Sequence, residues 1–166
     1  MSRKDFKKST RRFFVFLHAT FSSLWVGGAL SMLILIFLKH PTNGYQLLAY
    51  NTAIKLIDDF VIIGSANGVL LTGIILSWKT PWGFFKHWWV AIKLVLTIAM
   101  AVFGTVALGP WTNESVTMVQ EMGMEAINSN KYQHIQLMQM IFGPLQFSMM
   151  LFLLYLTVYK PFKKIK

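Results

Sequence analysis

The stretch "FFVFLHATFSSLWVGGALSMLILIFL", residues 13–38, contains no charged side chain and is long enough to cross a bilayer. A helix rises ~1.5 Å per residue and the hydrocarbon core is ~30 Å thick, so about 20 apolar residues suffice. Similar stretches follow at residues 53–78, with a polar lead-in, at 88–109 and at 135–159. Hydrophobic residues make up 55% of the chain and charged residues 13%, which is unlike a soluble domain. The sequence therefore predicts one all-α integral membrane domain, residues 1–166, with four spans.

The connections and the charges predict how these spans are arranged. Short turns around residues 41–44 and 81–83 favour an up-down-up-down four-helix bundle. Most of the sixteen Lys and Arg residues lie before residue 13, between the second and third spans, or after residue 159. The positive-inside rule therefore predicts a multi-pass protein of the cell membrane with both termini cytoplasmic. Because the first stretch is longer than the apolar core of a signal peptide, we expect it to be retained as a span.

The composition also limits the partners and metal ligands. The net charge of +10 is explained by topology and by attraction to anionic lipid, so the lipid bilayer is the expected partner and no nucleic acid is needed. A homo-oligomer is compatible with the sequence. The chain has no cysteine, which excludes disulfides, thiolate metal sites and covalently attached c-type heme. A bound metal would need His, Met, Lys, carboxylate or backbone ligands.

The segment between the third and fourth spans, residues 110–133, carries an apolar pattern of its own. Val116, Val119, Met122 and Ala126 recur at helical spacing, and polar side chains occupy the rest of the circumference. This pattern predicts a short helix that lies on the outer surface of the membrane.

His18 interrupts the first span. Counting from Arg12 at the headgroups, it lies ~9 Å below the inner surface. An ionisable side chain at that depth is expected to face the bundle interior or a cavity. Trp25 shares its helix face, and Gly28 near that face gives room for a flat macrocycle or for another helix. His18 is therefore either a metal ligand or a neutral ring hydrogen-bonded to a neighbouring helix.

A second ligand at similar depth has two candidates. Lys93 lies seven residues in from Lys86, ~10 Å along the helix, which matches the depth of His18. His87 lies at the interface but offers imidazole, the more usual donor to heme iron. If Lys93 is the ligand, then His87, Lys86 and Arg12 are available for heme propionates near the surface. The alternative for Lys93 is that its side chain snorkels toward the cytoplasmic face.

These residues carry a resemblance to a known family. The series His18, Trp25, Gly28 resembles the first-span motif of the HemJ-type protoporphyrinogen oxidases and the related CopD-type membrane proteins. The segment Trp89–Leu94 is similar to their lysine-bearing span. The resemblance covers about half of the chain, chiefly the first three spans, and implies b-type heme at His18 and Lys93. The fourth span and residues 110–133 show no match, so protoporphyrinogen oxidation itself is not implied.

Polar residues on the outer side form a separate group. His40 and His134 flank the first and fourth spans, and they are candidates for a second heme or a metal ion. Methionines lie near His134, and thioether with imidazole suits Cu(I). The i,i+4 spacing of Lys55 and Asp59 predicts a structural ion pair.

The sequence therefore favours a membrane b-type heme protein with one heme, a second being possible. It is expected either to exchange electrons with quinone or a respiratory oxidase, or to oxidise a small substrate as a heme-dependent oxidoreductase. One alternative is a carrier or permease for copper or another metal that uses the outer His and Met residues. Another is a structural subunit whose polar residues only join helices.

Overall fold

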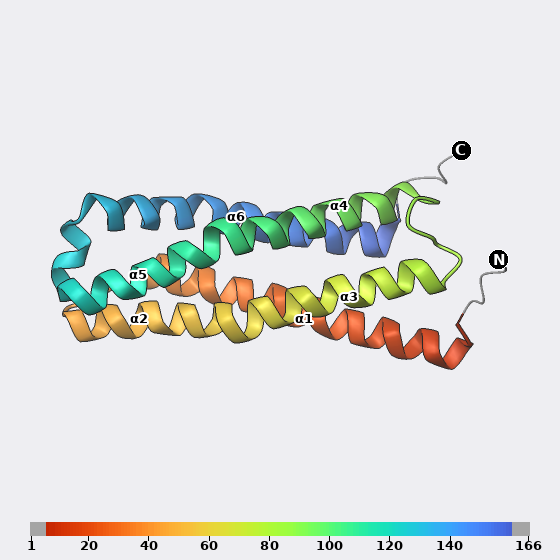
Figure 1. Cartoon of the computed structure of the whole chain (residues 1–166), viewed down its shortest axis with the longest axis horizontal. Coiled ribbons are helices and arrows are strands. Elements are labelled where there is room, and N and C mark those ends of the chain that lie inside the picture. The colour runs from red at the N-terminus through yellow and green to blue at the C-terminus, as the bar shows by residue number, and fades with distance from the viewer. Residues whose placement is uncertain (1–5, 161–166) are drawn as a thin grey trace.

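The computed structural model describes residues 6–160, and all of its regular structure is helical (Figure 1). Four long rods, each a single helix or a run of consecutive helices, are joined by short connections. The first rod is α1 (Lys8–Leu38), and the second joins α2 (Gly44–Leu56), the π-helical turn η1 (Ile57–Ile62) and α3 (Ile63–Lys79). The third joins α4 (Trp88–Phe103), the π-helical turn η2 (Gly104–Leu108) and α5 (Gly109–Met122). A 3-10 turn η3 (Gly123–Asn128) leads to the fourth rod, α6 (Asn130–Tyr159).

Each rod is long and apolar enough to cross a bilayer, as the sequence predicts. In their most apolar windows only 17% to 28% of the residues are buried, because large apolar side chains point away from the bundle. Phe16, Phe60 and Val158, for example, are at least 64% exposed. Such a surface is stable in contact with lipid rather than with water. The fold is therefore that of a multi-pass membrane protein.

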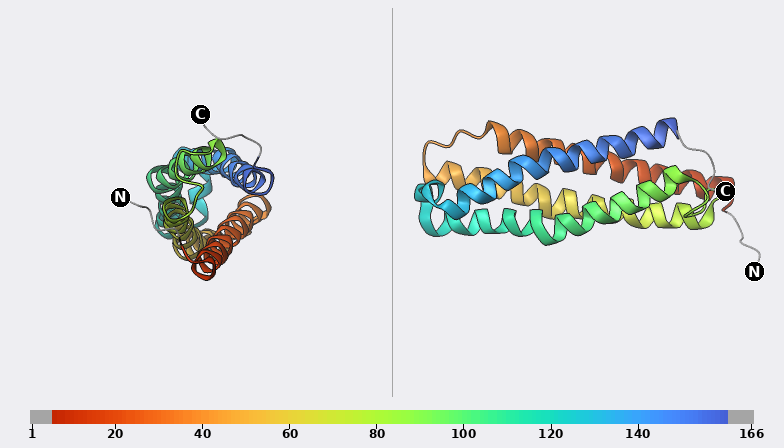
Figure 2. Two further views of the ribbon diagram at one scale, coloured as in Figure 1. Left: turned by 90° about the vertical axis from the view of Figure 1, so that its right-hand side faces the viewer. Right: turned by 90° about the horizontal axis from the view of Figure 1, so that it is seen from above.

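The two ends of the bundle differ (Figures 1 and 2). At one end, called here the Lys8 end, α1 begins, α6 ends, and the connection between α3 and α4 turns back. The Phe6 N–H donates to Lys79 O across this end at 3.1 Å. At the opposite end, called the Lys39 end, α2 begins beside η3, where a Cβ on Gly44 would lie 3.1 Å from the Met124 nitrogen.

The third rod corrects one prediction. Residues 110–122 do not form a separate helix lying on the membrane surface, because α5 continues α4 in a rod that spans Trp88–Asn128 with η3. The π turn explains the continuity. Pro110 cannot donate a backbone hydrogen bond and would break a regular helix, but the wider turn ends just before it, with the Gly109 N–H bonded to Gly104 O. The second rod also differs from the prediction, because it begins at Gly44, about two and a half turns before the predicted start at residue 53.

The extra length is held by a second apolar core. One core lies along the middle of the bundle and contains Trp25 and Met100. The other lies at the Lys39 end, where Leu47, Val119 and Ala126 are at most 2% exposed. The rods of 30 to 41 residues exceed the thickness of the hydrocarbon core at ~1.5 Å per residue. The second core lets them remain helical beyond it.

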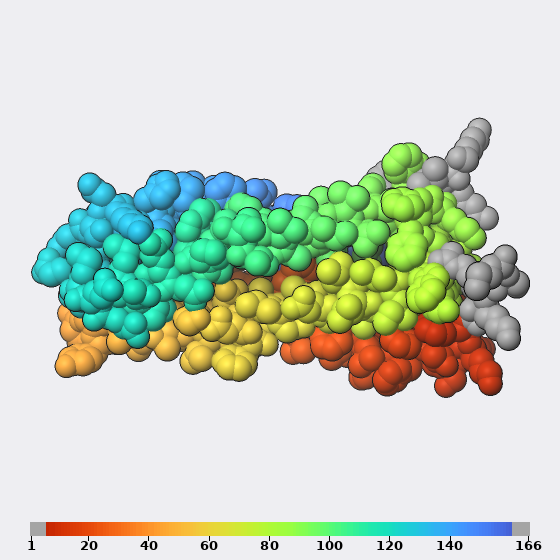
Figure 3. Space-filling view, viewed as in Figure 1, coloured from red at the N-terminus to blue at the C-terminus, as the bar shows by residue number. Residues whose placement is uncertain are grey.

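Helix α1 packs closely against η1 and α3 of the second rod, and small residues make this possible. A Cβ added at Gly28 would come 2.9 Å from Val61, and one added at Gly68 would collide with the ring of Phe21. Glycine at such positions lets two helices approach closely. The α3 and α4 sides are less closely joined, and atoms of α1 are visible in the seam between the second and third rods (Figure 3).

Candidate functional site

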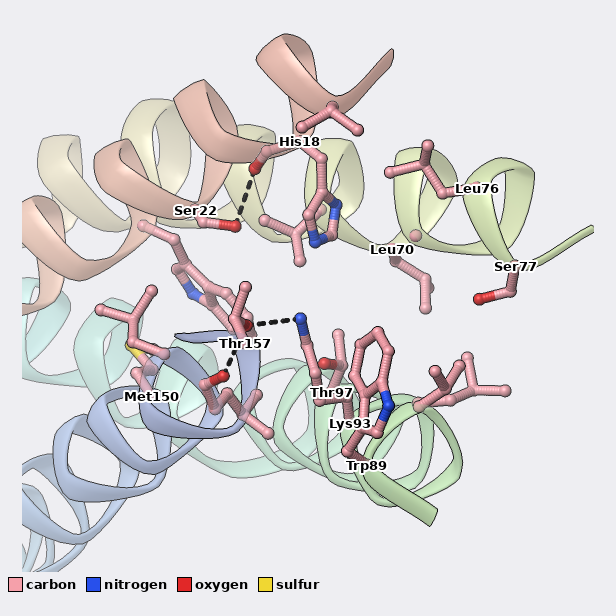
Figure 4. Close-up of a pocket in the computed structure, with 18 of the residues that line it drawn as sticks. His18, Ser22, Leu70, Leu76, Ser77, Trp89, Lys93, Thr97, Met150 and Thr157 are labelled. Carbon is pink, nitrogen blue, oxygen red and sulfur yellow. Dashed lines mark hydrogen bonds between the residues drawn. The ribbon is translucent and has the colours of Figure 1, made fainter. Parts of the chain in front are cut away.

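A cavity of about 290 Å³ opens between the rods toward the Lys8 end. All four rods contribute to its wall, and Figure 4 shows His18 and Lys93 pointing toward each other across it. The wall is mainly apolar and includes Trp25 and Trp89, with a small set of polar groups. A largely apolar cavity with few converging polar groups is typical of a ligand or cofactor site. Three residues predicted from sequence, His18, Trp25 and Lys93, therefore share one cavity.

His18 is held by a hydrogen bond to the neighbouring helix. Its Nδ1 lies 2.8 Å from Thr72 Oγ1, and this hydroxyl lies 2.6 Å from Gly68 O. The threonine has one hydroxyl proton, and the carbonyl can only accept. Thr72 therefore donates to Gly68 and accepts from the protonated Nδ1 of His18. This assignment leaves Nε2 as the unprotonated nitrogen of a neutral imidazole.

Nε2 is the nitrogen available to a ligand. The hydrogen bond to Thr72 uses Nδ1, and the ring's other hydrogen-bonding neighbour is the backbone of Val69 on the same helix as Thr72. Histidines that bind metals characteristically donate from their other ring nitrogen to a fixed acceptor, which sets the tautomer and the ring orientation. Gly73 keeps the space beside the ring open, since a Cβ there would lie 3.4 Å from His18 Cε1. The local structure is that of a preoriented imidazole ligand.

Lys93 enters the cavity from α4. Its Nζ donates to Thr157 Oγ1 at 2.7 Å (Figure 4), and this hydroxyl in turn donates to Leu153 O at 2.7 Å. Neither of the two ion pairs found among residues 6–160 involves Lys93. The amine therefore faces the cavity beside a neutral hydroxyl rather than a carboxylate.

Trp25 adds an unused donor to the cavity wall. The side chain is 4% exposed, and its Nε1 is the single buried side-chain nitrogen or oxygen in residues 6–160 that lacks a hydrogen-bond partner. Leaving such a donor unpaired costs ~1–3 kcal/mol. A bound group with an acceptor atom near the indole would recover that cost.

The mouth of the cavity is cationic and aromatic. Lys160 lines it and lies 5.8 Å from the ring centre of Trp82 and 5.9 Å from that of Trp89. Sequence reasoning missed Lys160, Thr72 and Thr157. The spacing of Gly68 and Thr72 was a usable signal, because it places two small residues on one face of α3. Lys160 follows the last apolar turn and resembles an ordinary interfacial lysine in the sequence.

The other predicted residues of this end lie outside the cavity. The His87 Nδ1 pairs with Trp82 O at 3.1 Å, and neither His87 nor Arg12 lines the cavity wall. Arg12 is exposed on α1. Gly28 packs against Val61 and Ile62, which fits the alternative that it serves helix packing.

The outer residues do not form a metal cluster. His40 lines a separate hollow with Met124 and Met140 at the Lys39 end, whereas His134 is exposed and is not part of that hollow. Within residues 6–160 no group of three or more His, Asp or Glu side chains is placed to hold a metal ion. The predicted ion pair is confirmed, with Lys55 Nζ 2.6 Å from Asp59 Oδ2.

Comparisons with known proteins identify no family for this chain. No protein-family model matches the chain, and neither a curated protein nor a solved structure matches it.

Proposed function

We propose that the protein is an integral membrane b-type heme protein with a redox role, and that His18 binds the heme iron in the cavity. The observation that carries the proposal is the hydrogen bond of His18 Nδ1 to Thr72, which leaves Nε2 unprotonated on a ring that points across the cavity toward Lys93. The unpaired Trp25 donor and the opening beside Gly73 are compatible with a planar group against α1 and α3. The donor set thus fits a heme.

Lys93 is better placed than His87 to serve as a second ligand to the iron. It lies across the cavity from His18, whereas His87 lies outside the cavity wall. A lysine binds iron through the neutral amine, and Thr157 is a neutral partner that does not compete as a carboxylate would. Lys160 at the mouth replaces Arg12 and His87 as the cation best placed for a propionate. Such a contact would be a charge-assisted hydrogen bond.

Bound heme would supply one-electron chemistry, with quinone, a respiratory oxidase or a small substrate as the exchange partner. The residues of the cavity would set the surroundings of the heme. Thr72 orients His18, the apolar wall limits water, and the lysines add positive charge near the iron and at the mouth. Burial and nearby positive charge are two of the means by which a protein adjusts a heme potential.

Heme content tests the proposal directly. The protein purified from cells with ample heme should show a Soret band, and pyridine hemochrome analysis should give one heme b per chain. His18→Ala should lose the heme, whereas His134→Ala, at the opposite end, should retain it. A second heme would make the content two and implicate His40 or His134. Heme-free wild-type protein, or full heme content in His18→Ala, would contradict the proposal.

The positive-inside pattern supports a proposed orientation with the Lys8 end, and so both termini, in the cytoplasm of the cell. The absence of native cysteine permits a clean test with single-cysteine variants. In intact cells, a membrane-impermeant maleimide should label exposed Thr42→Cys at the Lys39 end and leave Lys86→Cys unlabelled. The reverse pattern would invert the topology.

A metal carrier is the second candidate function, and one observation favours it. His40 shares its hollow with Met124 and Met140, and thioether with imidazole suits Cu(I). Stoichiometric copper in heme-free protein, lost in His40→Ala, would support this function in place of the first.

A further inference from the structure

Asp58 is the most unusual ionisable residue outside the cavity. It lies in the π turn η1, where its carbonyl accepts the hydrogen bond from the Ile63 N–H five residues later. Its side chain is 8% exposed, on the same buried face of the second rod as Asn51 and Ile54. Ionisable groups inside a membrane bundle are costly and mark functional positions, and π turns frequently occur at such positions.

The carboxyl group of Asp58 has no protein partner that offsets the cost of its position. Neither oxygen has a hydrogen bond or an ion pair among residues 6–160, and the group is not fully enclosed, since Trp25 Nε1 is the one enclosed polar side-chain atom there without a partner. The adjacent Asp59 takes the ammonium of Lys55, which also donates to Asn113 Oδ1 at 2.5 Å. The facing surface is backbone, since a Cβ on Gly109 would lie 3.7 Å from Asp58 Oδ2. A metal ion would need several oxygen ligands there, and these contacts do not provide them.

The charges around Asp58 come from its own rod. Asp59 and Lys55 are the near neighbours. Helix α1 carries no charged residue between Arg12 and Lys39, and α6 carries none between Lys131 and Lys160. The rest of α3 has none before Lys79, and the first five residues of α5 have none. Because Lys55 forms its ion pair with Asp59, ionisation of Asp58 would leave this part of the bundle with one negative charge that no cation balances.

A series of hydrogen-bonded polar side chains, called here the polar file, leads from the Lys39 end to the surroundings of Asp58. It consists of Lys39, Gln136, Gln139 and Thr112. Lys39 Nζ donates to Gln136 Oε1 at 2.6 Å, and Gln136 Nε2 donates to Gln139 Oε1 at 3.3 Å. Gln139 Nε2 then donates to Thr112 Oγ1 at 3.2 Å, and Thr112 donates to Leu108 O at 2.9 Å. Leu108 precedes Gly109, whose backbone faces Asp58.

We propose that Asp58 is a proton-binding site that exchanges its proton with the aqueous phase at the Lys39 end along this file. Protonation of Asp58 removes the excess negative charge of the group formed by Lys55, Asp58 and Asp59, and with it most of the cost of holding that charge in an apolar surrounding. Water hydrogen-bonded to the amides and to Thr112 would carry the proton, because polar side chains are what water needs in an apolar interior. Burial lowers the pKa of Lys39 to about 8, so the amine at the entrance can itself release and recover a proton near neutral pH.

Dicyclohexylcarbodiimide tests the protonated acid. The O–H of a carboxylic acid adds across a carbon–nitrogen double bond of the reagent, so the adduct has the summed mass of both molecules and needs no other reactant. Mass spectrometry of the full-length protein after digestion should find the adduct at Asp58, several-fold above Asp59, with a yield that falls as pH rises. Asp58→Asn should abolish it, and the matched Asp59→Asn should not. An unlabelled Asp58, or equal labelling of the two, would overturn the proposal.

Infrared spectroscopy tests the route. In wild type and Asp59→Asn, transfer into D2O should shift the C=O stretch of the protonated acid, and this band should be missing in Asp58→Asn. Gln139→Leu, which breaks the file, should slow the shift at least several-fold, whereas Gln146→Leu, which lies outside the file, should not. An unchanged rate in Gln139→Leu would overturn the route. Neither measurement depends on heme, so this proposal can fail or succeed apart from the proposed function.

Discussion

Replacing Thr72 by valine removes one hydroxyl from the support of His18 and leaves the side-chain shape almost unchanged. In wild type, Thr72 Oγ1 lies 2.8 Å from His18 Nδ1 and 2.6 Å from Gly68 O. Valine leaves the Nδ1 proton without this acceptor, which costs ~1–3 kcal/mol for a buried group. Loss of such a partner behind a metal-bound histidine typically weakens metal binding by about 10- to 100-fold.

Heme titration of the purified apoprotein measures this effect. We expect Thr72→Val to bind heme about 10- to 100-fold more weakly than wild type, and Thr72→Ser, which keeps the hydroxyl, to remain close to wild type. Nitrogen-15 NMR of labelled histidine in the heme-free protein gives a second readout. His18, assigned by His18→Ala, should show a protonated Nδ1 in wild type and a mixture of tautomers in Thr72→Val. Equal heme affinity in the valine and serine variants would refute the role given to Thr72.

Three further changes test the packing, a helix cap and the buried lysine. Gly68→Ala should lower the free energy of unfolding by ~1–3 kcal/mol, because the added methyl group would meet the Phe21 ring. Gly64→Ala on the same helix places its methyl group in open space and should leave the free energy of unfolding unchanged. Thermal unfolding in detergent compares the two variants. Asn43→Ala removes the acceptor of the Gln46 N–H at 3.0 Å and should cost ~0.5–2 kcal/mol in the same assay. Burial lowers the pKa of Lys39 to about 8, below the ~10.4 of an unfolded lysine, so the folded state is penalised below pH 8 and gains stability as pH rises to ~10.4. Lys39→Met should flatten that rise in a series of unfolding midpoints against pH, and an equal rise in wild type and variant would assign it to other groups.

The parts of the site that follow from depth could be predicted from the sequence. Counting inward from Arg12 and Lys86 predicted that His18 and Lys93 lie at similar depth, and the structure places both in the wall of one cavity. Thr72 could not be predicted in the same way, because its contact depends on the rotation of α3 about its axis relative to α1. That rotation follows from the π turn η1 and from the close packing at Gly68, which hydropathy does not report.

The fold likewise could be predicted from the sequence in part. Four apolar stretches predicted four membrane-crossing helices, and the structure has them. The pattern in residues 110–122 predicted a surface helix because its polar side chains suggested an interface with water. Much of that polarity faces other helices instead, since Thr112 and Ser115 are buried at 3% and 2% exposure. Whether a polar residue faces water or another helix depends on tertiary contacts, which the spacing of residues along one helix does not indicate.

The two π turns have a consequence for how sequence maps onto surface. Each fits one extra residue into a turn of helix, so every residue beyond it lies ~100° behind the position it would have in a uniform α-helix. In the third rod the lipid-facing stripe of α4, which includes Val95 and Val102, is out of phase with α5 by that amount. The α5 face with Thr112, Ser115 and Val119 is thereby directed into the protein. Converting Gly104–Leu108 to regular α-helix at unchanged length would therefore rotate this polar face by ~100° out of the protein, whereas deleting one residue there would give a uniform helix and leave the face where it is.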